Sequence, residues 1–170
     1  MKKFQHYFFP LAVLLITTVI AHGQPQLAAP FAFNGSQNGG GIFRLDQPGA
    51  SPGIIYNFNH LHPHMPVGGV CAGDEDWLYG MVVYNGTNNE GAAYRVRKDG
   101  TGFTKLFDLG SGARAVGTPT RHTDGKIYFN ADNTIKVFDP NTMGVESIPA
   151  NGFILSKNLL IDSDDYIYYL

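Results

Sequence analysis

Three histidines at alternate positions, His60, His62 and His64, are the most evident candidates for metal ligands in this sequence. In an extended segment, alternate side chains project to the same face, so the three imidazoles could together hold Zn²⁺ or Cu²⁺. Pro63 and the position between two strand-like runs favour a solvated loop instead, and no carboxylate lies nearby in the sequence to orient a ligand imidazole. We therefore expect a loop and no cofactor, with metal binding by these histidines as the alternative.

Two acidic runs could also do chemistry: Asp74-Glu75-Asp76, and the group Asp162, Asp164 and Asp165. Such carboxylates could bind Ca²⁺, or could serve as the acid and base of a glycosidase. Neither run has the glycine-punctuated spacing of a calcium loop, and both fall where the chain is expected to turn between strands. The sequence therefore predicts solvated turn carboxylates at both places.

The sequence contains no recognisable nucleophile motif. No Gly-x-Ser-x-Gly pattern occurs, and Cys71 lies in a run of small residues typical of a buried strand. The run Gly39-Gly40-Gly41 does not open a helix, so it predicts a turn before a strand and not a phosphate-binding loop. No catalytic residue is predicted.

One loop has the composition of a ligand-binding surface. It joins an aromatic residue to several amides, and its candidate contacts are Tyr84, Asn85, Asn88 and Asn89. Loops held by a rigid scaffold are common binding sites, and side chains of these types suit a glycan or a protein ligand. We expect this loop to carry binding.

The elements that position these residues are expected to be short strands, which makes the fold all-β. No stretch after residue 24 has apolar residues at helical spacing for three turns, whereas alternating or aromatic-rich runs recur between Gly, Asn and Asp clusters. The pairs Asp99-Gly100 and Asp124-Gly125 are typical of tight hairpin turns. The expected strands span 29–33, 42–45, 54–58, 68–72, 77–84, 92–97, 103–109, 116–121, 126–130, 134–138, 145–148, 153–161 and 166–170.

These runs recur in a fixed order. The pattern around Arg44 returns 51 residues later around Arg95 (95 − 44) and then 41 residues later around Lys136 (136 − 95). A second series begins at Trp77, Lys126 and Tyr166, at offsets of 49 (126 − 77) and 40 (166 − 126). A period of this length with several strands is typical of a β-propeller blade.

The repeat predicts about three and a half four-stranded antiparallel blades, too few to close a ring comfortably. The blade parts span about 28–58, 66–109, 113–148 and 153–170. The expected open edge indicates either a fragment of a longer chain or a protein that associates with another copy. A β-sandwich is the alternative, because it also uses short strands at regular spacing. Aromatic residues at repeated positions are expected to pack between blades, with Arg44 and Arg95 facing outward; these aromatic residues are Phe43, Tyr79, Tyr94, Tyr128 and Tyr168.

The first residues are typical of a secretory signal peptide. Lys2 and Lys3 precede the apolar run 7–20, and Ala21-His22-Gly23 supplies small residues for cleavage after Gly23. The expected mature region, residues 24–170, carries 10 basic and 14 acidic residues, because both leader charges are lysines. A net charge of −4 gives no bulk attraction to nucleic acid, and no membrane span is expected after cleavage. The single Cys71 excludes an internal disulfide.

Several segments resemble the tandem GloVer-type repeat of bacterial proteins. The run 78–80 resembles that family's Leu-Tyr-Gly segment, and the runs 39–45 and 88–96 resemble its glycine loop followed by an aromatic-Arg-apolar strand. The run 98–103 resembles its Asp-Gly-Thr-Gly-Phe turn. The run 74–77 departs from the family's Asp-Gly turn. The resemblance covers most of residues 34–138 and implies a secreted or surface-displayed, propeller-like protein.

Two classes of function follow from these patterns. The favoured one is a secreted or cell-surface module without catalysis, which binds or displays a glycan or a protein through loops at one end of the blades. The other is a propeller-type enzyme acting on extracellular polysaccharide, with the histidine segment and the turn carboxylates as its site. The first is favoured because the sequence does not place the residues of the second together.

Overall fold

In the computed structural model, the described residues are 27–31, 39–46, 51–59, 64–74, 76–84, 90–110, 115, 117–131, 134–149, 158–162, 164 and 166–169. None of these residues lies in a helix, so the all-β expectation is confirmed for this part of the chain. They accordingly include no helix with the length and hydropathy needed to span a membrane. The signal peptide predicted over residues 1–23 lies outside these ranges.

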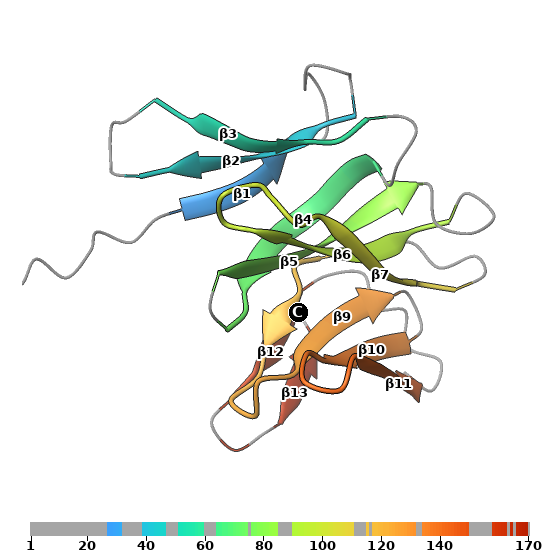
Figure 1. Cartoon of the computed structure of the whole chain (residues 1–170). Helices are drawn as coiled ribbons and strands as arrows, with labels where there is room; N and C mark the ends of the chain where they lie inside the picture. The colour runs from blue at the N-terminus through green and yellow to red at the C-terminus, as the bar shows by residue number, and fades with distance from the viewer. Residues whose placement is uncertain are drawn as a thin grey trace, which may run out of the picture.

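The described residues form thirteen strands in four antiparallel sheets, which follow one another along the chain (Figure 1). The first sheet contains β1 (Leu27–Phe31), β2 (Gly41–Leu45) and β3 (Gly53–Asn57). The second contains β4 (His64–Ala72), β5 (Trp77–Tyr84), β6 (Ala92–Arg97) and β7 (Thr104–Asp108). The third contains β8 (Thr120–Arg121), β9 (Ile127–Ala131), β10 (Thr134–Asp139) and β11 (Gly144–Pro149). The fourth contains β12 (Leu159–Ile161) and β13 (Ile167–Tyr169).

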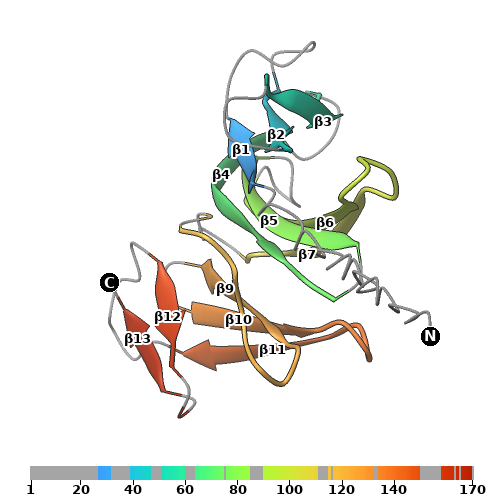
Figure 2. The same ribbon diagram turned by 90° about the vertical axis from the view of Figure 1, so that its left-hand side faces the viewer.

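The sheets stack face to face, and each gap between consecutive sheets is filled by its own hydrophobic cluster (Figures 1 and 2). The cluster between the first and second sheets contains Ile42, Phe58, Leu78, Val82, Ala92, Tyr94 and Val96. The cluster between the second and third contains Tyr79, Met81, Ala93, Leu109, Ala115, Ile127, Phe129, Ala131 and Phe138. The cluster between the third and fourth contains Ile135, Val137 and Leu159. Each large side chain buried in this way contributes about 1.5–3 kcal/mol.

Alternation along the strands explains why the second sheet can bury both of its faces. Leu78 and Val82 of β5 pack toward the first sheet, whereas Tyr79 and Met81 pack toward the third. Successive side chains of a strand point to opposite faces, so a strand that is apolar throughout serves two neighbours. The sequence of β5 therefore specifies a strand whose sheet is buried on both faces.

Strand pairing corrects one of the sequence alignments by a single residue. Val96 is paired with Leu78, and Phe138 is paired with the equivalent Ile127, so β6 and β10 are 42 residues apart (138 − 96) and not 41. A shift of one residue exchanges the two faces of a strand. Ile135 and Val137 consequently pack toward the fourth sheet, whereas Tyr94 and Val96, their partners in the 41-residue alignment, pack toward the first.

The strands that come first in three consecutive sheets lie next to one another at the sheet edges. β4 contacts β8, and β8 contacts β12. The N–H of Gly69 donates to Thr118 Oγ1 at 2.8 Å, and the N–H of Thr118 donates to Asn158 Oδ1 at 2.8 Å. These residues are separated by 49 and 40 positions, the offsets of the repeat itself. Equivalent positions of successive sheets are therefore joined in series at one edge of the stack.

The two repeated arginines were expected to face solvent, but both are half-buried. Arg44 is half-buried, and its Nη1 donates to the carbonyl oxygen of Lys98 in the second sheet at 3.1 Å. Arg95 stacks on Trp77 with 4.3 Å between its Cζ and the ring centroid. Both arginines lie on strand faces that pack against the following sheet, where a planar guanidinium can stack on a ring or bond a carbonyl.

Candidate functional site

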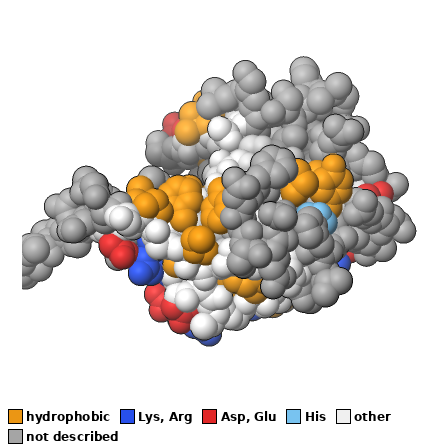
Figure 3. Space-filling model, turned by 90° about the horizontal axis from the view of Figure 1, so that it is seen from above, with side chains coloured by type: hydrophobic (Ala, Val, Ile, Leu, Met, Phe, Trp, Pro, Cys, Tyr) orange, Lys and Arg blue, Asp and Glu red, His pale blue; other side chains and the backbone are white. Residues whose placement is uncertain are grey.

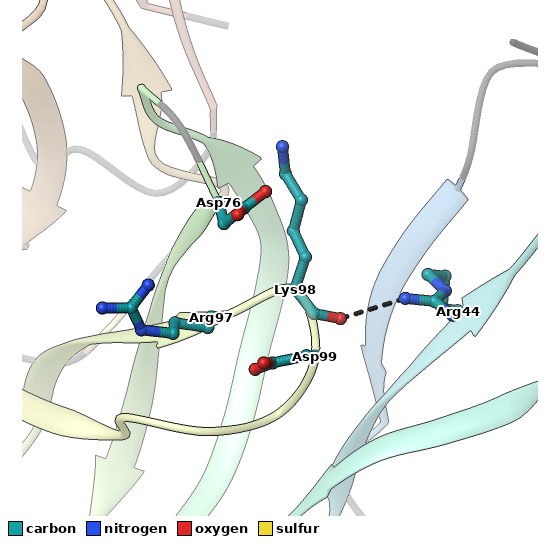
Figure 4. A pocket seen from close by; sticks show the side chains of 5 residues that line it. All are labelled: Arg44, Asp76, Arg97, Lys98 and Asp99. Carbon is teal, nitrogen blue, oxygen red and sulfur yellow. Dashed lines mark hydrogen bonds between the residues drawn. The ribbon is translucent and has the colours of Figure 1, made fainter.

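Five charged residues line a cavity of about 280 Å³ between the first and second sheets (Figure 4). Arg44 reaches in from β2 and Arg97 is the last residue of β6, whereas Asp76, Lys98 and Asp99 belong to the turns at the same end of the second sheet. The lining carries three cations and two anions, so its formal charge is +1. This is the candidate binding site that the described residues form.

Backbone hydrogen bonds hold the turn between β6 and β7, which contains Lys98 and Asp99, in a fixed shape. The N–H of Arg97 donates to the carbonyl of Thr101 at 2.9 Å, and the N–H of Gly100 donates to the carbonyl of Arg97 at 2.8 Å. Gly100 has a φ of 86°, and a Cβ there would collide with the carbonyl oxygen of Ile55 in β3. Only glycine allows this turn to approach the first sheet so closely. The closeness places Lys98 and Asp99 beside Arg44.

Hydrogen bonds preorganise the charged groups of the cavity. Arg44 Nε donates to Asp46 Oδ1 at 2.6 Å, while Asp99 Oδ1 accepts from the N–H and the hydroxyl of Thr101 at 2.8 Å and 2.7 Å. These bonds to Thr101 lower the pKa of the Asp99 carboxyl below its ordinary value. The guanidinium of Arg97 lies 4.7 Å from the centroid of the Trp77 ring. The site can thus offer guanidinium donors to an anion and carboxylate acceptors to hydroxyl groups.

The acidic runs act as turn carboxylates, as predicted, wherever they are described. Asp74 forms an ion pair with Arg121, which links the second and third sheets. Asp162 accepts from the N–H groups of Asp164 and Tyr166 and from the hydroxyl of Tyr168, each at 3.0 Å. Glu75 and Asp165 lie outside the described residues. Asp76 alone from these runs lines the cavity.

His64 of the predicted histidine segment and Tyr84 of the predicted binding loop lie side by side at the opposite end of the second sheet. His64 is paired with Tyr84 across β4 and β5, and their ring centroids are 5.6 Å apart. His60 and His62, and likewise Asn85, Asn88 and Asn89, lie outside the described residues. Among the described residues no group of three or more His, Cys, Asp or Glu side chains could hold a metal ion. Metal binding by the three histidines stays a prediction.

The cavity was not found from the sequence, although part of it could have been. The sequence predicts that Arg44 faces solvent, and it indicates only a strand end and a turn at Arg97, Lys98 and Asp99. Arg44 and Lys98 are 54 residues apart, close to the period of the repeat. An alignment that stacked each period on the next would have placed the end of β2 beside this turn. The tight approach at Gly100 depends on packing that a period does not specify.

Cys71 packs against the cluster between the second and third sheets. Burial raises the pKa of its thiol to about 12, and the nearby charge of Arg121 offsets only part of that rise. A thiol with such a pKa stays protonated near neutral pH and is a poor nucleophile.

The sequence matches no known protein-family model and no curated protein. The resemblance to the GloVer-type repeat therefore stays a prediction from the motifs.

Proposed function

We propose that this protein is an exported binding module of the β-propeller type that acts without catalysis at the cell surface. Its ligand is an acidic glycan, held in the cavity lined by Arg44, Asp76, Arg97, Lys98 and Asp99. The proposal keeps the GloVer-type repeat as the origin of the blades. Export rests on the leader over residues 1–23.

The stack of sheets supports a propeller over a sandwich. A sandwich has two sheets with one shared core, whereas here the second and third sheets each contribute to two of the clusters. The edge contacts of Gly69, Thr118 and Asn158 repeat the same bond between equivalent positions. Blades that radiate from a central axis bring equivalent inner strands together in this way.

The observation that carries the choice of ligand is the mixed charge of the cavity. Arg44 and Arg97 lie on opposite sides of the lining (Figure 4), and each can bind a carboxylate or a sulfate, since guanidinium groups form charge-assisted hydrogen bonds with such anions. Asp76 and Asp99 can accept from sugar hydroxyls, and the apolar Trp77 ring lies beneath Arg97. An acidic sugar presents an anion and hydroxyls together, so it matches both halves of the lining.

A glycan array that contains acidic and neutral oligosaccharides tests the proposal directly. Acidic glycans should be retained, and an assay for new reducing ends should show no cleavage. Arg97→Gln should weaken binding roughly tenfold or more, because a hydrogen bond to a charged group is worth about 1.5–3 kcal/mol. Lys136→Gln is the matched control, since this cation lies on β10 outside the cavity.

Three results would each contradict a separate part of the proposal. Equal retention of neutral glycans would exclude recognition of the anion. Equal loss in the Arg97 and Lys136 variants would exclude this cavity as the site. Release of reducing ends would identify the propeller-type enzyme that the sequence left as the alternative.

A further inference from the structure

Every interface inside the stack has the same direction. Each inner sheet has a preceding face, which packs on the sheet before it, and a following face, which packs on the sheet after it. In the second sheet Tyr94 lies on the preceding face and Tyr79 on the following face. In the third sheet Phe138 lies on the preceding face and Val137 on the following face. A following face therefore always meets a preceding face.

The described residues leave one face of each kind exposed. Ile42 of the first sheet packs on the second sheet, so the next residue, Phe43, points to the opposite, preceding face. Ile54 is the cross-strand partner of Phe43 and lies on the same face, where its side chain is 55% exposed. Leu159 of the fourth sheet packs on the third, so the paired residues Leu160 and Tyr168 belong to the following face, with exposures of 51% and 47%. Figure 3, seen from above, shows hydrophobic side chains on the upper side of the molecule, where Figure 1 places β1–β3.

We propose that two copies of this chain associate head to tail, with the following face of the fourth sheet of one copy packed on the preceding face of the first sheet of the other. The two exposed faces have the two complementary directions found inside the chain. A second copy therefore supplies a partner built by the same rules as the internal interfaces. A pair that uses both of these faces of each copy covers them in two equivalent interfaces.

Strand pairing assigns the contacts across this interface. Leu45 is paired with Leu27 as Phe138 is with Ile127, so Leu45 and Phe138 occupy equivalent positions on preceding faces. Tyr168 is paired with Leu160 as Tyr79 is with Cys71, so Tyr168 and Tyr79 are equivalent on following faces. Inside the chain, the ring of Tyr79 lies 6.0 Å from that of Phe138. Tyr168 of one copy should accordingly contact Leu45 of the other.

The inference rests on the propeller-type stacking proposed above and is independent of the ligand. Light scattering on the purified protein over a range of concentrations should give the mass of two chains. Leu45→Glu and Tyr168→Lys should each raise the dissociation constant roughly a hundredfold, because each places an unpaired charge in an apolar interface. An equimolar mixture of the two variants should restore the pair, because one interface then joins Glu to Lys and the other is unaltered.

Ile148→Glu is the matched control, since this side chain is 40% exposed on β11 of the third sheet, away from both end faces. If Leu45→Glu lacks a cooperative melt, Ile54→Glu replaces it on the same face at a more exposed position. A single-chain mass at all concentrations would overturn the inference. Dissociation by only one of the Leu45 and Tyr168 variants would also overturn it, because the pair would then form between two preceding faces or between two following faces. Acidic-glycan binding that persists in a single-chain variant separates a failure of association from a failure of the proposed function.

Discussion

The buried hydroxyl of Tyr94 leads to a prediction that runs against the usual effect of a core substitution. The side chain is fully buried, and among the described residues its hydroxyl has no hydrogen-bond partner. Burial also raises the pKa of this phenol, which stays protonated. An unsatisfied buried polar group costs about 1–3 kcal/mol. Tyr94→Phe removes that cost while keeping the ring.

The gain is reduced by the contacts that the oxygen makes. Each contact between heavy atoms is worth about 0.1–0.2 kcal/mol, so a handful of them offsets well under 1 kcal/mol. The ring contacts with Phe58 and Phe103, at centroid distances of 5.2 Å and 5.5 Å, are preserved. We expect Tyr94→Phe to raise the free energy of unfolding by about 1 kcal/mol, or the melting temperature by roughly 3 °C.

Tyr79 provides the matched control, because it is equally buried on the neighbouring strand and its hydroxyl is hydrogen-bonded to Arg95. Tyr79→Phe should lower the free energy of unfolding by about 1–3 kcal/mol, since it removes an acceptor from a half-buried guanidinium. Urea denaturation of both variants, with unchanged m-values, measures the two effects. If Tyr94→Phe destabilises the protein as much as Tyr79→Phe does, the hydroxyl is satisfied in the folded protein and the reasoning is refuted.

Three further outcomes can be checked on the same protein. Because burial raises the pKa of Cys71 to about 12, iodoacetamide near pH 8 should alkylate it only after unfolding, and rapid labelling of the folded protein would exclude that environment. Gly100→Ala should lower the free energy of unfolding by about 3 kcal/mol, against about 1 kcal/mol for Gly125→Ala. Both glycines have positive φ, but only a Cβ at position 100 would meet a backbone carbonyl. Equal losses of stability in urea titrations would contradict this expectation. Hydrogen bonds from Thr101 lower the pKa of Asp99, so the contribution of this carboxylate to stability is present above the ordinary value of 3.8 and is lost as the pH falls through the lower folded-state value. Asp99→Asn should therefore flatten the dependence of the free energy of unfolding on pH, measured between about pH 5 and about pH 2. An unchanged pH dependence in this variant would count against the turn geometry.

The positions of the strands could be predicted from the sequence because they depend on local signals. Apolar and aromatic runs end at turn residues that restrict the backbone, so the expected strands over 77–84 and 92–97 agree with β5 and β6 at both ends. The agreement is poorer for the segment 116–121, whose described residues, 117–121, form a strand only at Thr120–Arg121. The small and polar residues that precede Thr120 specify contacts with neighbouring sheets, such as the bond from Gly69 to Thr118, and not pairing within their own sheet.

The facing of side chains was harder to predict than strand position. Arg44 and Arg95 were expected to face outward because charged residues usually lie in solvent. Their location follows from which strand face meets the next sheet, and that depends on register, where one residue exchanges the two faces. The cavity depends on packing and not on register, since it forms only where the turn at Gly100 approaches β3.

The bond that joins equivalent edge positions also bears on how such a chain can grow. Its donor is a backbone N–H, at Gly69 in one contact and at Thr118 in the next, and its acceptor is a hydroxyl in one and an amide in the other. Chemically different pairs thus make the same connection between neighbouring sheets. A gene segment encoding one sheet could be duplicated or lost, and the flanking sheets would still present a suitable donor and acceptor to each other. Unequal recombination would then lengthen or shorten the protein in steps of one period, 40 or 49 residues in this sequence, without a new kind of contact having to evolve.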